Sequence, residues 1–215
     1  MIEIEAEYYV KEILTNEYCL KSIFESIDSS NSELGVVSSD LIYTLITEGV
    51  LIDYLRPGIE WMIEKGFLNN LIQTILKTTN IETEEDKETF TFLLNTLKNF
   101  FELPKSILEA RETIIHSHLL KLAKIQKDLR IEILKVLSKY YTIVIEERKK
   151  FVEEGGLPIL GKCLKKTQDV IDLNSLGDLI IQLLMGLEGV WYDWVVFKFK
   201  EQKYEKYILL LDLHW

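Results

Sequence analysis

The chain has 215 residues, 47% of them hydrophobic, which is enough to bury at least one core. Its net charge is −10, and residues 1–103 carry 19 Asp and Glu against 7 Lys and Arg, so this half repels phosphate and argues against nucleic-acid binding. The acidic half either attracts a basic partner surface or only keeps the protein soluble.

Apolar residues at helical spacing predict helices along the first third of the chain. The first covers residues 3–14, and Asn16 is placed to cap the second. A polar loop is expected over residues 28–35, so Ser38 or Ser39 should cap the helix that follows.

Stronger helical patterns fill the middle of the chain. Residues 86–101 form the clearest one, with Phe90, Leu93, Leu94, Leu97, Phe100 and Phe101 on the buried face. Pro104 suits the first turn of the next helix, which we expect to run to about Ser117. Shorter helices are expected over residues 119–125 and 129–144, and another leads into Phe151.

Residues 151–164 contain a two-glycine corner between two helices. Gly155 can end a helix in the left-handed conformation, and Pro158 suits the first turn of the next one. Residues 61–75 fit the same template, with Gly66 in the place of Gly155. The matched apolar positions are Ile63, Leu68, Leu71 and Ile75 in one copy and Val152, Leu157, Leu160 and Leu164 in the other.

A poorer copy lies at residues 111–122. Ile114, Leu119 and Leu122 hold its apolar positions, and Ser117 stands in the glycine position. The copies start at residues 63, 114 and 152, and are therefore 51 and 38 residues apart.

These corners resemble those of the armadillo/HEAT-like helical repeat superfamily, whose repeats run roughly 40–47 residues. The resemblance implies an all-α fold, an irregular right-handed armadillo/HEAT-like solenoid that forms one domain over residues 1–215. An irregular helical bundle with coincidental corners is the alternative.

Aromatic side chains crowd the end of the chain, among them Trp191, Trp194 and Phe197. Trp191 and Trp194 share a face if this segment is helical. That face either folds back as a cap on the domain, beginning at about residue 189, or joins two copies of the chain in a homodimer. We expect the cap and keep the homodimer as the alternative.

The sequence offers no convincing catalytic, cofactor or metal site. His116 and His118 are two residues apart and point to different sides of a helix. Glu112 and His116 are four apart, which we interpret as a surface pair, because a zinc site needs further ligands at useful spacing. There is no phosphate-binding loop and no dinucleotide fingerprint. We therefore expect a protein that is not an enzyme, with a hydrolase on a helical bundle as the alternative.

The expected location is the cytoplasm, with the nucleus also open. The acidic start lacks the basic and apolar regions of a signal peptide, and the longest apolar runs are too short to span a bilayer. Cys19 and Cys163 each fall within an apolar stripe, so we expect reduced thiols in the core.

Armadillo-like chains usually bind partners on the concave face, which is lined by the last helix of each repeat. The resemblance therefore implies a scaffold, adaptor or regulatory subunit that binds a partner protein, and we take the helices that begin at Leu68, Leu119 and Leu157 as those of the binding face. The polar sides of these helices supply the expected partner-binding residues, Asn70, Gln73, Lys77, His118, Lys121, Lys162 and Lys165. A closed bundle with a buried polar pocket would instead favour the enzyme.

Overall fold

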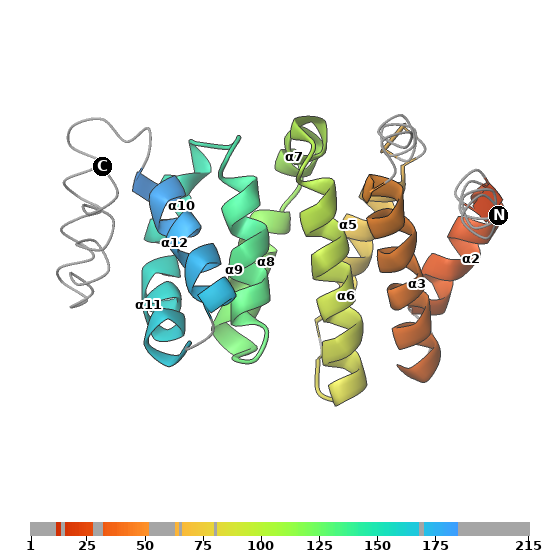
Figure 1. Ribbon diagram of the computed structural model, residues 1–215, viewed down its shortest axis with the longest axis horizontal. Coiled ribbons are helices and arrows are strands. Elements are labelled where there is room, and N and C mark those ends of the chain that lie inside the picture. The colour runs from red at the N-terminus through yellow and green to blue at the C-terminus, as the bar shows by residue number, and fades with distance from the viewer. Residues whose placement is uncertain are drawn as a thin grey trace. The chain divides into compact units, whose positions relative to one another are not determined.

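The computed structural model describes residues 12, 13, 16–27, 32–51, 63, 64, 66–79, 81–167 and 170–184. Every regular element among these residues is an α-helix, which confirms the all-α prediction (Figure 1). The chain separates into two compact units, Met1–Ala110 and Arg111–Trp215, and each unit is described by itself. That all residues form one domain stays a prediction.

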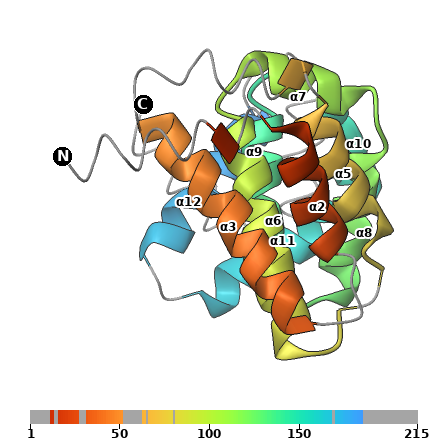
Figure 2. The ribbon, with the colours of Figure 1, turned by 90° about the vertical axis from the view of Figure 1, so that its right-hand side faces the viewer.

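The first unit is built from two layers of helices. Its elements are α2 (Glu17–Ile27), α3 (Ser32–Leu51), α5 (Phe67–Lys77) and α6 (Glu84–Phe100), followed by α7 (Pro104–Arg111), which ends at the boundary. Helix α2 packs against α3, and α5 packs against α6. Figure 2 shows α2 and α3 side by side. The pairs are stacked so that α2 meets α5 in one layer and α3 meets α6 in the other.

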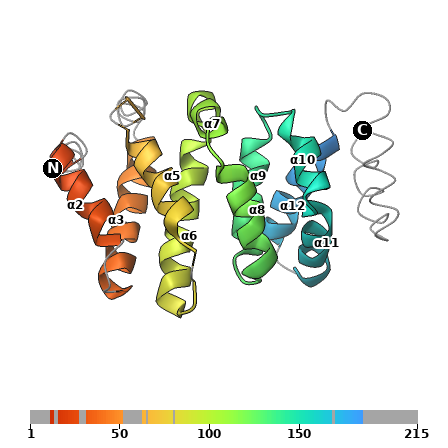
Figure 3. The same cartoon turned by 180° about the vertical axis from the view of Figure 1, so that it is seen from behind.

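The second unit repeats this plan. It contains α8 (Ile115–Ile125), α9 (Arg130–Tyr140), α10 (Glu147–Glu153), α11 (Gly156–Lys166) and α12 (Val170–Leu184). Helix α8 pairs with α9, and α11 pairs with α12. In Figure 3, α8 and α11 form the layer nearer the viewer, and α9 and α12 lie behind them.

The two glycine corners have the predicted backbone. Gly66 and Gly155 have φ angles of 80° and 85°, so both are left-handed, a conformation that glycine adopts without a Cβ penalty. Each donates its N–H to the residue three positions earlier, at 2.9 Å to the Ile63 carbonyl and 3.1 Å to the Val152 carbonyl. The apolar residues matched between the two copies are buried.

Gly156, the second glycine of its pair, is needed for a different reason. A Cβ atom added at Gly156 would overlap the ring of Phe151, which is fully buried and packs edge-on against Tyr141 at 5.7 Å between centroids. At Gly155, an added Cβ would meet nothing within 4 Å. The pair therefore combines a backbone requirement with a packing requirement.

The predicted middle corner is wrong in its register. Helix α7 ends at Arg111 and α8 begins at Ile115, so Ser117 lies inside α8 and not at a turn. The Thr113 hydroxyl accepts a hydrogen bond from the Ile115 N–H at 3.2 Å, and this contact takes the place of the expected glycine. Ile114, predicted to be apolar and inward, is 71% exposed.

The start of α3 also differs from the prediction. The helix already begins at Ser32, and Ser38 and Ser39 are buried within it, so neither caps it. A run of Ser and Gly is typical of a loop, but here Gly35, Ser38 and Ser39 lie on the buried side of a helix.

Other expectations met mixed outcomes. Asn16 caps α2, since its side-chain oxygen accepts the N–H groups of Tyr18 and Cys19 at 3.1 and 3.2 Å. The predicted buried face of α6 is confirmed in full.

The prediction that both cysteines lie in the core is confirmed for one of them. Cys163 is buried as expected, but Cys19 is exposed, because the buried side of α2 runs through Phe24.

Some predictions concern residues outside the described part of the chain. They are most of the helix over residues 3–14, the cap from about residue 189, and the aromatic side chains Trp191, Trp194 and Phe197.

Candidate functional site: a pocket between α2 and α5

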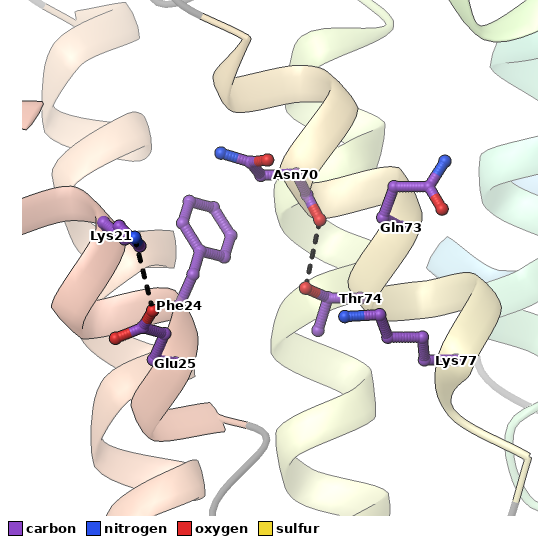
Figure 4. Close-up of a pocket in the computed structure, with 7 residues that line it drawn as sticks. All are labelled: Lys21, Phe24, Glu25, Asn70, Gln73, Thr74 and Lys77. Atoms are coloured by element: carbon purple, nitrogen blue, oxygen red, sulfur yellow. Dashed lines mark hydrogen bonds and ion pairs between the residues drawn. The ribbon is translucent and has the colours of Figure 1, made fainter.

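A surface pocket of about 200 Å³ lies between α2 and α5 in the first unit (Figure 4). Its lining residues are Lys21, Phe24 and Glu25 from α2 and Asn70, Gln73, Thr74 and Lys77 from α5. Three of these, Asn70, Gln73 and Lys77, are expected partner-binding residues, and the structure brings them to one site.

Helical spacing explains why α5 presents a polar face here. Asn70, Gln73 and Lys77 are exposed and follow one another by three and four residues, so they lie along one side of the helix. The opposite side of α5 is mainly apolar and holds the helix against the core. The residues buried there include Leu68, Leu71, Ile72 and Ile75.

Phe24 is the apolar side chain of the pocket. It is only 7% exposed and packs edge-on against Phe67 of α5, with ring centroids 4.8 Å apart. Figure 4 shows the Asn70 side chain reaching toward this ring. The Thr74 hydroxyl donates to the Asn70 carbonyl at 3.0 Å, so the contact of Thr74 is with its own helix.

Charged groups border the pocket. Lys21 and Glu25 of α2 lie 3.8 Å apart and are both well exposed, so their ion pair is weak and open to competition by a ligand. Lys77 is in the last turn of α5, where the helix dipole favours a positive charge. The pocket thus offers carboxamide donors and acceptors, two ammonium groups and one carboxylate around an aromatic ring.

The other four predicted residues lie in the second unit. Lys121 on α8 and Lys162 and Lys165 on α11 are exposed, and His118 on α8 is half-buried. The predicted set is therefore divided between the two units. Sequence reasoning missed Lys21, Phe24 and Glu25, because only the packing of α2 against α5 brings them to the pocket.

The second unit contains a buried polar cluster around His116. The imidazole is 2% exposed, its Nε2 lies 2.5 Å from the Tyr141 hydroxyl, and its Nδ1 lies 3.6 Å from the Glu147 carboxylate. The Tyr140 hydroxyl donates to the same carboxylate at 3.1 Å. The predicted surface pair of Glu112 and His116 is wrong, because α8 begins only at Ile115 and its register turns His116 inward.

Burial keeps the His116, Tyr140 and Tyr141 side chains of this cluster uncharged at neutral pH. Burial, together with the positive charge of Lys150, lowers the pKa of His116 to about 4, so the imidazole is neutral at neutral pH. Burial and the Glu147 carboxylate raise the pKa values of Tyr140 and Tyr141, and both stay protonated.

Arg148 connects this cluster to α12 through hydrogen bonds. Its guanidinium donates to the Tyr141 carbonyl at 3.1 and 2.6 Å and to the Gln182 side chain at 3.2 Å. A His, a Glu and two Tyr could transfer protons, but an imidazole that is 2% exposed does not meet a substrate. We therefore interpret the cluster as packing.

The described residues lack both a metal-binding cluster and a membrane-spanning helix. They contain no group of three or more His, Cys, Asp or Glu side chains arranged to hold a metal ion. None of their helices has both the length and the apolar character of a membrane span. No protein-family model matches the chain, and no curated protein is significantly similar to it.

Proposed function

We propose that this protein is a non-catalytic scaffold or regulatory subunit that binds a partner protein, and that the pocket between α2 and α5 is one of its contact sites. The observation that carries the proposal is the convergence of Asn70, Gln73 and Lys77 with α2 residues on a single open pocket.

The size and chemistry of the pocket suit a protein ligand. Its volume of about 200 Å³ is below the roughly 300–1,000 Å³ of typical small-molecule sites, so it fits one side chain of a larger partner. Phe24 gives that side chain an apolar floor. The carboxamides of Asn70 and Gln73 can each donate and accept hydrogen bonds, as an extended peptide backbone requires.

We also infer that the helices are armadillo/HEAT-like repeats of a right-handed solenoid. The support is the shared two-layer plan of the units and the matching corners before α5 and α11. Helices α5, α8 and α11 have 11 residues each, and begin at Phe67, Ile115 and Gly156. In each case a further helix follows: α6, α9 or α12.

This grouping changes the expected binding face. The last helices of the repeats are then α6, α9 and α12, whereas the seven predicted residues lie on α5, α8 and α11. The pocket is accordingly on the layer opposite the one that armadillo-like chains usually use. Among the described residues, the hydrolase alternative would rest on the His116 cluster, whose imidazole is buried.

Site-specific photo-crosslinking tests the pocket. A benzophenone amino acid is placed at Gln73 in the pocket and, as a matched control, at Lys124, which is exposed on α8. In native cells we expect a discrete protein adduct from position 73 that is missing from position 124, and that Asn70→Ala removes. Identical adducts from both positions, or none from position 73, would contradict the proposed site.

A further inference from the structure

Helix α3 carries a stripe of exposed aliphatic side chains. Leu34, Val37 and Leu41 are 43%, 60% and 37% exposed, and their spacing of three and four residues places them along one face. The opposite side of the helix is buried through Ser39 and Ile42, which are both 0% exposed. Helix α3 therefore has apolar residues toward the core and toward solvent.

Acidic residues border this α3 stripe. Glu33 and Asp40 are exposed and neighbour the aliphatic residues on the helix surface, and α3 contains no Lys or Arg along its length. The α3 stripe is thus bordered along its Val37 side by two exposed carboxylates.

We propose that the α3 stripe binds an amphipathic helix of a partner protein whose apolar face is bordered by Lys or Arg. The aliphatic side chains supply the desolvation that stabilises a helix on a helical surface. Glu33 and Asp40 select for cationic neighbours and against anionic ones, because like charges at an interface are strongly unfavourable. This second surface lies on the layer opposite the pocket, so its test is independent of that of the pocket.

Charge also separates this ligand from two other occupants. The N-terminal segment of the chain, residues 1–11, has three Glu and one Lys, so it would bring negative charge to an acidic border. A second copy docked through the same face would oppose Glu33 and Asp40 with acidic residues of its own, since a two-fold interface uses one surface twice. A basic helix meets neither repulsion.

The experiment titrates full-length protein against a fluorescent, designed helical peptide with Leu at the same spacing and Lys on the flanks, followed by anisotropy. We expect saturable binding that weakens about tenfold in Val37→Asp. Nonspecific attraction of a cationic peptide would instead strengthen with the added negative charge. Val37→Ser, which leaves the charge unchanged, should weaken binding severalfold, and Glu33→Lys should also weaken it.

Three controls make the result decisive. Ile125→Asp, at a residue of α8 that is 71% exposed, should bind like the wild type. A peptide with Glu in place of Lys should not bind, and circular dichroism should show Val37→Asp and Val37→Ser folded. Equal binding by both Val37 variants and the wild type, or by both peptides, overturns the proposal.

Two further outcomes reassign the α3 stripe and also overturn the proposal. A dimer in sedimentation that Val37→Asp dissociates identifies a second copy as the occupant. Much tighter peptide binding after deletion of residues 2–11 identifies the chain's own N-terminal segment.

Discussion

His116 makes the stability of the second unit depend on pH. Its pKa is lowered to about 4 in the folded protein, against 6.5 for an ordinary histidine. As the pH falls from 6.5 toward 4, the unfolded chain therefore takes up a proton that the folded protein refuses, and stability is lost. When complete, this loss amounts to about 3 kcal/mol.

We expect the free energy of unfolding, measured with urea, to fall over this pH range by about 3 kcal/mol less in His116→Phe than in the wild type. Carboxylates titrate near the same pH in both proteins, so the difference between them isolates the histidine. Proton NMR gives an independent check, and an imidazole of His116 that titrates near 6.5 would contradict the assignment.

At the scale of the elements, the left-handed backbone of the corners before α5 and α11 can be tested by substitution. Gly66→Ala and Gly155→Ala should each destabilise the protein by about 1–2 kcal/mol, because an L-residue is strained at positive φ. Space is not the cause, since an added Cβ meets nothing within 4 Å at either site.

Gly177 within α12 is the matched control. An added Cβ there also meets nothing within 4 Å, but its φ is not positive. Gly177→Ala should therefore stabilise the protein by up to about 1 kcal/mol through helix propensity. Thermal melting of the three variants tests this difference. Equal shifts of the melting temperature at all three positions would contradict backbone strain at Gly66 and Gly155.

Helices with strong periodicity could be predicted from sequence, and those defined by contacts could not. The buried face of α6 and the corners at Gly66 and Gly155 follow from local pattern and turn chemistry. The start of α3 does not, because serines buried against neighbouring helices have the same local signature as serines in a loop. Only tertiary packing distinguishes the two.

The candidate site shows the same division. The polar face of α5 follows from helical spacing alone, so Asn70, Gln73 and Lys77 could be predicted. Their neighbours Lys21 and Glu25 come from a helix that is separated from α5 by about 40 residues of chain. The pair of Glu112 and His116 was predicted wrongly because the helix expected to run from Pro104 to about Ser117 ends at Arg111, so only His116 lies in α8.

At the scale of the whole molecule, the cap and the homodimer predicted for the aromatic end of the chain differ in the oligomeric state that they imply. We expect a monomer by light scattering at tens of micromolar, with Trp194 in a cap. Trp194→Asp should then lower the melting temperature, because it buries an unpaired charge. A dimer that this substitution converts to a folded monomer would contradict the cap and favour the homodimer.

The contact between Gly156 and Phe151 makes the order of substitutions matter in any sequence that keeps this corner. A larger residue at position 156 is blocked while the Phe151 ring fills the space, and that ring is fixed by its packing on Tyr141. Shortening Phe151 first opens room for a side chain at 156, whereas the reverse order passes through a clashing intermediate. Related sequences should therefore pair a small residue at 156 with an aromatic at 151, or change both positions together.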